Sequence, residues 1–281
     1  MINIQNLNFG YNRENLFNNL DLSLAPGSIS GLLGKNGAGK TTLLKLMAGL
    51  LFPREGSINI MEQNPAERSP YFLQDLFFLP EEFELPDLSP GLYSKLYAPF
   101  YPAFDFEKYQ NFLSEFELPQ ETKFKNLSFG QKKKFLLSFG FASGSRFLLL
   151  DEPTNGLDIP SKSQLRRIMA SEAADDSAII ISTHQVRDLE NLIDPVIILD
   201  EGQIIFNHSM EEINSRLRVT HEADPPEPES VLYMEKTLNG YITVSENRTS
   251  EESNINLETL FTTVLTSRDK ILSVFKGGRL S

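Results

Sequence analysis

The sequence predicts an α/β fold in which strands and helices alternate around a mainly parallel sheet. Two observations lead to this prediction. Short apolar segments with the length of buried strands alternate with segments of helical spacing over most of the chain. Residues 34–41 also fit the pattern G-x-x-x-x-G-K-[ST], which joins a strand to a helix and cradles phosphate groups.

The N-terminal segments supply the first strands and the helix that follows the glycine-rich loop. Apolar side chains alternate along residues 2–9 and 20–24, as expected for strands with one buried face. Residues 28–33 run largely apolar into the loop. Residues 40–51 place leucines and a methionine at helical spacing, so we expect a helix there.

Residues 80–144 differ in composition from the segments on either side. They are rich in phenylalanine, tyrosine and proline, and their apolar side chains follow helical spacing around residues 92–101 and 106–116. We therefore expect a helical insertion between two strands of the α/β core. Most of its aromatic side chains are expected to pack the insertion itself.

The α/β pattern resumes after the insertion and is followed by a separate C-terminal stretch. We expect strands at residues 146–150, 178–182, 196–199 and 203–207, and helices at residues 161–174 and 185–193. The proline-rich residues 225–229 are typical of a linker. Beyond it, residues 231–236 and 241–246 are expected to form a hairpin, and Asn256 is expected to cap a final helix.

Composition and charge exclude several classes of function. The chain has 281 residues and a formal net charge of -12, which disfavours broad binding to a phosphate backbone. It contains no cysteine, so disulfides, thiolate zinc sites and a cysteine nucleophile are excluded. We recognise no signal peptide, and no apolar run approaches the roughly 18 residues that span a bilayer. Any membrane role is therefore expected to need another polypeptide.

The glycine-rich loop has the residue types that bind a nucleoside triphosphate. Its glycines let backbone N–H groups close around phosphates, and the helix that follows presents the positive end of its dipole. Lys40 can place its charge on the β- and γ-phosphates, Thr41 can offer a hydroxyl to Mg²⁺, and Thr42 can reach the α-phosphate. The non-functional alternative is an ordinary strand-to-helix turn with a solvated lysine. The predicted nucleotide-binding residues of the loop are Gly34, Lys35, Asn36, Gly37, Ala38, Gly39, Lys40, Thr41 and Thr42.

Two carboxylates end the apolar strand at residues 147–150. In open α/β sheets such a strand end delivers its side chains to the crevice where ligands bind. Asp151 is expected to hold Mg²⁺ directly or through water, and Glu152 to accept a proton from the attacking water or orient it. Taken alone, the pair would be interpreted as capping or solvated groups. The phosphate-binding loop makes the catalytic interpretation the favoured one.

His184 follows another apolar strand, residues 178–183. A lone histidine at such a place is often a helix-start or core residue. The same strand end is also expected to face the nucleotide, where the imidazole can bond the γ-phosphate and fix the attacking water. We predict this catalytic role for His184.

The order of these motifs resembles the nucleotide-binding subunits of ABC transporters over residues 1–215. Residues 127–131, Leu-Ser-Phe-Gly-Gln, resemble the LSGGQ signature of that family, and residues 155–158 resemble its D-loop. His184 lies at the position of the family's switch histidine. Tyr11 matches the aromatic residue that stacks on adenine, although it can also be a plain core aromatic.

The signature precedes a long helical run, so its N–H groups can form a second anion site. The resemblance implies that Ser128, Gly130 and Gln131 serve the nucleotide held by an opposite protomer, so that two MgATP join two subunits head to tail. The lysines at residues 132–134 are expected to be a solvated face, with phosphate steering as the second choice.

Two positions depart from the family pattern. Phe129 replaces the first glycine of the signature, which puts the geometry of the shared site in doubt. The segment 78–81 resembles the Q-loop but has Glu81 where glutamine is usual. Glu81 can still approach Mg²⁺ or water, and we retain it as a candidate metal ligand.

The resemblance implies a P-loop NTPase core of the ABC ATPase type with an antiparallel β edge and a helical subdomain. We expect the ATPase domain at residues 1–215, its helical subdomain at about 82–144, and a C-terminal appendage at 216–281 used for dimer contact or regulation. The implied cofactors are ATP and Mg²⁺. The implied partners are an integral-membrane permease and a second ATPase subunit, identical or paralogous, with no nucleic acid.

These features predict an ATP-hydrolysing transport subunit at the cytoplasmic face of the membrane. The aromatic stretch at residues 99–105 looks most like export-type bacterial systems. Two other functions stay open. One is a non-transport ABC ATPase that acts on ribosomes or DNA, which the single phosphate loop and the acidic charge disfavour. The other is a module that binds ATP without turnover, which the intact Lys40, Asp151, Glu152 and His184 disfavour.

Overall fold

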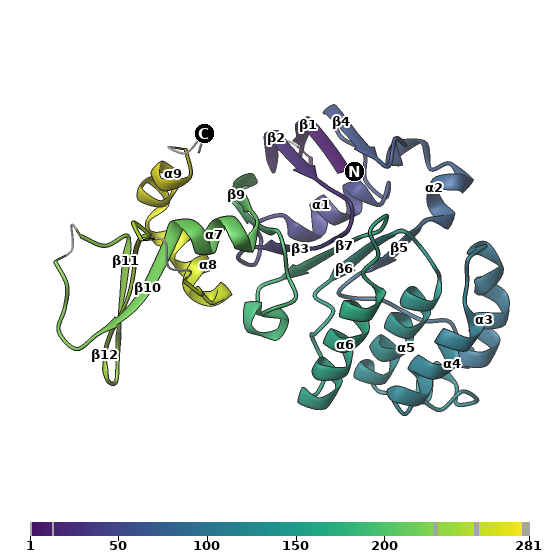
Figure 1. Cartoon of the computed structure of the whole chain (residues 1–281). Coiled ribbons are helices and arrows are strands. Elements are labelled where there is room, and N and C mark those ends of the chain that lie inside the picture. The colour runs from purple at the N-terminus through teal and green to yellow at the C-terminus, as the bar shows by residue number, and fades with distance from the viewer. Residues whose placement is uncertain (1, 13, 228–229, 250–252, 277–281) are drawn as a thin grey trace.

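A mainly parallel sheet lies at the centre of the computed structural model, which describes residues 2–12, 14–227, 230–249 and 253–276 (Figure 1). Its strand order is β5-β6-β7-β3-β8-β9, and neighbouring strands are parallel except for β8 and β9. Every residue of β6 and β7 is buried, which suits strands that are covered on both faces. The strands are β3 (Ser28–Leu33), β5 (Leu76–Leu79), β6 (Phe147–Asp151), β7 (Ala178–Thr183), β8 (Val196–Asp200) and β9 (Gln203–His208).

One face of this sheet is covered by α1 (Lys40–Met47) and by a separate antiparallel sheet with the order β2-β1-β4 (Figure 1). Leu43 and Met47 of α1 share a core with Leu149 of β6. The helix ends before residue 51, its predicted end, because Gly49 adopts a left-handed conformation with φ of 66°. The strands of the antiparallel sheet are β1 (Ile2–Phe9), β2 (Phe17–Leu24) and β4 (Glu55–Ile60).

Helices cover the opposite face, and the predicted helical insertion is confirmed. Tyr93 and Tyr109 meet Phe139 edge to face, at ring-centroid distances of 5.3 and 6.3 Å. These rings pack the insertion as expected, whereas Phe100 is 69% exposed. The helices of this layer are α3 (Pro90–Tyr97), α4 (Phe106–Glu115), α5 (Phe129–Ala142) and α6 (Ile159–Glu172), and short elements nearby are α2 (Pro70–Gln74), η1 (Pro65–Glu67), η2 (Ala98–Phe100) and η3 (Phe124–Asn126).

The prediction of a helix over residues 185–193 is wrong. Only a short 3-10 turn, η4 (Val186–Leu189), forms there. Asn191 has a left-handed backbone with φ of 65°, and Pro195 disfavours helical conformation in the residue before it. Leu189 is nevertheless buried, so apolar spacing in this segment reflects core packing without a helix.

The C-terminal elements form a lobe on the side of the cassette away from α3 and α4 (Figure 1). The predicted hairpin is confirmed as β11 and β12, and β10 completes the antiparallel order β10-β12-β11. Asn256 caps α8 as expected, because its Oδ1 accepts a hydrogen bond from the Thr259 N–H at 2.8 Å. The elements are α7 (Met210–Arg216), β10 (Leu217–Glu222), β11 (Tyr233–Thr237), β12 (Gly240–Glu246), α8 (Leu257–Thr266) and α9 (Arg268–Lys276).

This lobe packs directly on the cassette. Leu257, Leu260 and Val264 of α8 belong to the same apolar core as Leu189 and Ile193. Arg187 of η4 also forms an ion pair with Glu258 of α8. Residues 228–229 of the predicted linker lie outside the described residues. Within the part of the chain that is described, we find no helix with the length and apolar character needed to cross a membrane.

Candidate functional site

A cavity of about 480 Å³ lies where the glycine-rich loop meets the carboxyl end of the sheet. The glycine-rich loop, the segment between β1 and β2, the segment after β5 and the residues that follow β6 and β7 all line it. The lining residues are Tyr11, Leu16, Asn36, Gly37, Gly39, Lys40, Thr41, Thr42, Glu81, Glu152 and His184. The site predicted from the sequence is therefore largely brought together in one place.

The loop needs glycine for conformation and for space. Gly37 and Gly39 have φ of 82° and 108°, in the left-handed region that favours glycine. A Cβ on Gly34 would lie 2.5 Å from the Leu199 carbonyl oxygen. Among the described residues no side chain caps the start of α1, so its first-turn N–H groups stay available to an anion.

Lys40 lies across this loop as a buried cation. Its Nζ donates to the carbonyl oxygens of Gly34 at 2.8 Å and of Lys35 at 3.2 Å. Burial lowers the pKa of Lys40, and the nearby charges of Glu152, Asp151 and Glu81 oppose that shift. The ammonium is thus held at the loop by carbonyl groups and by an acidic surrounding.

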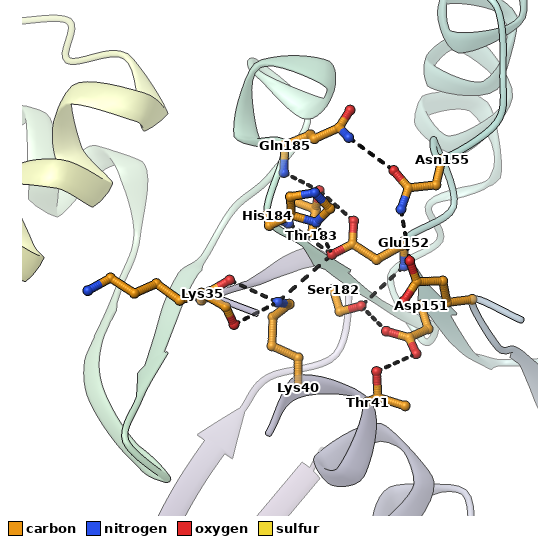
Figure 2. Close-up of polar contacts among 12 residues, drawn as sticks. Lys35, Lys40, Thr41, Asp151, Glu152, Asn155, Ser182, Thr183, His184 and Gln185 are labelled. Atoms are coloured by element: carbon orange, nitrogen blue, oxygen red, sulfur yellow. Dashed lines mark hydrogen bonds and ion pairs between the residues drawn. The ribbon is translucent and has the colours of Figure 1, made fainter. Parts of the chain in front are cut away.

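Asp151 is fully buried below the loop and does not line the cavity. Its Oδ2 accepts a hydrogen bond from Thr41 Oγ1 at 2.7 Å, and its Oδ1 accepts one from Ser182 (Figure 2). A carboxylate beside a hydroxyl offers the hard oxygen atoms that Mg²⁺ prefers. No group of three or more histidine or acidic side chains arranged for a metal occurs in the described chain. The residues present therefore fit a Mg²⁺ that takes its remaining ligands from phosphates and water.

Glu152 points the other way, toward His184 (Figure 2). Its Oε1 lies 2.7 Å from His184 Nδ1 and accepts the His184 backbone N–H at 3.0 Å. Its Oε2 accepts a hydrogen bond from Thr183 Oγ1 at 3.2 Å, and Lys40 Nζ lies 3.9 Å from Oε1. The backbone of Glu152 is left-handed with φ of 47°, which is uncommon outside glycine and clusters at functional sites. The carboxylate is therefore fixed beside the phosphate-binding loop in a position suited to a general base.

Several polar contacts around the two carboxylates were not predicted. Ser182 and Thr183, which bond Asp151 and Glu152, form the polar end of an otherwise apolar strand, and that change of character was the available signal. Asn155 donates to Glu81 Oε1 at 3.0 Å and accepts from Gln185 Nε2 at 3.1 Å. Glu81, Asn155 and Gln185 thereby form a chain of side chains along the edge of the cavity.

Tyr11 lies beside the loop and is half exposed. Its ring meets Phe9 edge to face, with centroids 5.1 Å apart. Its hydroxyl lies 3.2 Å from Thr42 Oγ1. The alternative of a plain core aromatic is therefore wrong for Tyr11.

The signature residues lie apart from this cavity, at the start of α5. Ser128 and Gln131 form a capping box, in which the Gln131 N–H donates to Ser128 Oγ and Gln131 Oε1 accepts the Ser128 N–H. A Cβ on Gly130 would lie 2.6 Å from the Gly156 carbonyl oxygen, so this glycine permits close packing of the two segments. Phe129 stacks on Phe83 with ring centroids 5.1 Å apart.

One lysine after the signature differs from the expected solvated face. Lys133 is fully buried, and its Nζ donates to the Glu152 carbonyl oxygen at 2.9 Å. Lys132 is partly exposed, whereas the Lys134 side chain is only 15% exposed and lies 3.9 Å from Asp158. The prediction is therefore wrong for Lys133, because the helix turns this side chain toward the end of β6.

The fold and the loop geometry together define a P-loop ATPase, and comparison with known proteins identifies its family. Residues 17–155 match the ABC transporter family. The chain is 31% identical over 217 residues to the lantibiotic transport ATP-binding protein SrtF of Streptococcus pyogenes, across 73% of this chain and 90% of that protein. It is 28% identical to the ABC transporter ATP-binding protein YtrB of Bacillus subtilis, across 76% of this chain and 73% of that protein.

A solved structure of an ATP-binding subunit of an ABC transporter has the same fold, with a TM-score of 0.70 at 26% identity. The alignment covers 76% of this chain and 92% of that one. The chain belongs to the ATP-binding subunits of ABC transporters, a family of nucleotide-binding ATPases. The predicted family, fold class and ATP-binding function are thus confirmed.

Proposed function

We propose that this chain hydrolyses MgATP as one half of a head-to-tail pair of ATPase subunits and thereby drives export through a separate membrane subunit. The observation that supports this most strongly is the position of Glu152, held by His184 and Thr183 and 3.9 Å from Lys40. Such an arrangement combines a phosphate-binding cation with a fixed base. The partner ATPase is either a second copy or a paralogue.

Each side chain has one task in the proposed reaction. Lys40 neutralises the β- and γ-phosphates, and Glu152 orients the attacking water and accepts its proton. His184 contacts the γ-phosphate and steadies both the water and the Glu152 carboxylate. Thr41 and Asp151 would hold Mg²⁺, which supplies positive charge to the phosphates when it is bound. Glu81 lines the same cavity, and we propose it as a further contact to the metal or to water.

Tyr11 is proposed as the surface on which adenine stacks, since half of its surface is exposed beside the loop. Ser128, Gly130 and Gln131 are proposed to contact the γ-phosphate held by the other subunit. Their helix start is exposed at Ser128, where an anion could approach its N–H groups. We divide the chain accordingly into an ATPase unit at residues 1–215, with its helical part at about 82–144, and an appendage at 216–281.

A groove on the cassette supports the proposal that the chain binds a membrane subunit. It has a volume of about 710 Å³ and lies between the end of α1, α2, β5 and η2. Leu50 and Phe100, which line it, are 46% and 69% exposed. An apolar groove of this kind accepts the apolar face of a helix, so we propose that a cytoplasmic helix of the permease binds here. This would place the chain at the cytoplasmic face of the membrane.

The export direction follows from similarity alone. Relatives named for transport include the bacitracin transport ATP-binding protein BcrA of Enterococcus faecalis and a lipopolysaccharide export ATP-binding protein, LptB, of Acidithiobacillus ferridurans. These names describe those proteins. For this chain we propose export, and the membrane subunit would select what is carried.

The proposal is tested by capturing the partner. Tagged Glu152→Gln protein, which should keep ATP bound, is purified from gently solubilised cells with MgATP. We expect a protein with several membrane-spanning segments to co-purify, and Phe100→Asp to abolish its recovery while ATP binding persists. Recovery of ribosomes or DNA-associated proteins without a membrane protein would favour the non-transport ATPase. Absence of ATP turnover in the wild-type chain would instead favour a module that only binds ATP.

A further inference from the structure

Lys133 is a buried charge that the proposed reaction does not use. It lies in the second turn of α5 and has no exposed surface. Burying an ammonium group is unfavourable unless other groups compensate it. Its Nζ donates to the Glu152 carbonyl oxygen at 2.9 Å, which places this cation on the backbone of the proposed base.

Aromatic rings lie beside the ammonium group. The ring of Phe129 lies over it, with Nζ 5.1 Å from the ring centroid. Phe83 stacks on that ring with centroids 5.1 Å apart. Burial lowers the pKa of Lys133, and the charges of Glu81, Glu152 and Asp151 oppose that shift. Both departures from the family pattern, Phe129 and Glu81, therefore act on the surroundings of this one lysine.

The contact matters because of the backbone that it reaches. Glu152 has φ of 47°, a conformation that non-glycine residues adopt only when their surroundings hold it. Its N–H donates to the Ser182 carbonyl oxygen at 3.1 Å on one side. On the other side its carbonyl accepts from Lys133 Nζ at 2.9 Å and from the Asn155 N–H at 3.2 Å. The side chain leaves between these two anchored groups and meets His184. The two backbone groups and the contacts of the carboxylate with Thr183 and His184 together set the direction of the Glu152 side chain.

We propose that Lys133 is a positioning residue for hydrolysis, which holds the left-handed backbone of Glu152 through its carbonyl and so keeps the Glu152 carboxylate aimed at the phosphate-binding loop. This inference rests on the proposed hydrolytic function and adds a residue to it. Lys133 touches neither nucleotide nor water in this account. Its effect is therefore on the rate of the chemical step and passes through Glu152.

The test compares variants that keep or remove the donor. Lys133→Met and Lys133→Gln both end one bond short of the lysine Nζ. The Met side chain has no donor, and the amide donor of the Gln side chain falls short of the carbonyl. Both are expected to lower kcat about tenfold with KM for ATP changed less than about twofold, since misaimed catalytic groups slow the chemical step. Lys133→Arg keeps a donor and a charge and should recover most of the rate. Lys132→Met, on the partly exposed side of the same helix, is the matched control and should hydrolyse ATP at the wild-type rate.

A double variant separates positioning from general damage. If Lys133 acts through Glu152, Lys133→Met in the Glu152→Gln background should slow hydrolysis no further than Glu152→Gln alone. The inference would be overturned if the losses of kcat in the two single variants multiplied in the double variant. It would also be overturned if Lys133→Arg lost as much kcat as Lys133→Met, or if the Met and Gln variants both kept the wild-type kcat. If the Met variant does not fold, the Gln variant decides by the same criteria. A wild-type chain without ATPase activity would instead overturn the proposed function itself.

Discussion

The helices α1 and α5 both begin at a glycine-containing motif, but their first turns are completed differently. Gly39 precedes α1 in a left-handed conformation, and within the described chain no side chain caps it. Ser128 precedes α5 and forms a reciprocal capping box with Gln131, with hydrogen bonds of 3.2 and 2.9 Å. One helix start is left open, whereas the other already uses two of its backbone donors.

This difference indicates which of the two helix starts can hold a phosphate by itself. Near α1 the same cavity contains Lys40, hydroxyl groups and the Glu152 carboxylate. At α5 the nearby buried lysine, Lys133, donates to the Glu152 carbonyl oxygen and has no exposed surface. Ser128 accepts a hydrogen bond in the capping box, so its own O–H proton is still available to a ligand. The start of α5 is suited to completing a site on a nucleotide that another loop already holds.

The largest expected effect tests the open helix start. Lys40→Ala removes the cation of the phosphate-binding loop and should lower kcat/KM for ATP by about 10³-fold, as loss of a preorganised charge at a transition state does. Steady-state ATPase measurements check this. Lys45→Ala, on the same helix, is the control and should keep the wild-type kcat/KM. A loss of less than tenfold in Lys40→Ala would mean that phosphate binding does not depend on this loop.

A substitution at the capped start of α5 should lower the rate of ATP turnover without changing the affinity of a single subunit for nucleotide. Ser128→Asp keeps a good helix cap but places a negative charge where the γ-phosphate is proposed to lie. We expect kcat to fall about 10²-fold, comparable to loss of a transition-state donor, with the affinity of the monomer for nucleotide unchanged. Titration with a fluorescent nucleotide measures that affinity. A parallel loss of affinity would contradict the separation of the two helix starts.

A smaller effect concerns stability at the capped helix start. Phe129→Gly restores the residue usual in the family, but it removes the stack on Phe83 and the ring over Lys133. We expect the free energy of unfolding to fall by about 2 kcal/mol, from lost apolar contact and the low helix propensity of glycine. Urea denaturation measures this. Unchanged stability would show that the aromatic contacts at Phe129 do not hold α5 in place.

The smallest expected effect lies at the contact between η4 and α8, which involves neither of the two helix starts. Arg187 and Glu258 form an ion pair with side chains 78% and 49% exposed. Exposed pairs contribute little, so Arg187→Ala should change the free energy of unfolding by less than about 0.5 kcal/mol. A double-mutant cycle with Glu258→Ala measures the pair. A coupling above about 1 kcal/mol would mean that this contact fixes the C-terminal lobe.

Local patterns predicted the central fold and most residues of the candidate site. The loop at residues 34–41 constrains its own conformation through glycine, and the apolar strands before Asp151 and His184 identify the sheet edge where side chains converge. The order of β1, β2 and β4 in a separate sheet depends on long-range pairing. The family resemblance implied only an antiparallel β edge, and this strand order was not predicted.

At two places the structure differs from what the local sequence pattern predicted. Leu189 and Ile193 have helical spacing and are buried, but the backbone at Asn191 and the position of Pro195 turn the chain away from a helix. Lys133 belongs to a run of three lysines that looks solvated, and its burial depends on the Glu152 carbonyl, 19 residues away in sequence. Neither a periodicity nor a charge run contains that information.

The central claim is that one ATP is shared between the open helix start of one subunit and the capped helix start of another. The most direct test is the mass of the Glu152→Gln chain in solution, measured by light scattering with and without MgATP. We expect a monomer of 31.8 kDa without nucleotide and twice that mass with MgATP, and we expect Ser128→Asp in the same background to remain monomeric. A Glu152→Gln chain that stays at 31.8 kDa in saturating MgATP would contradict the account.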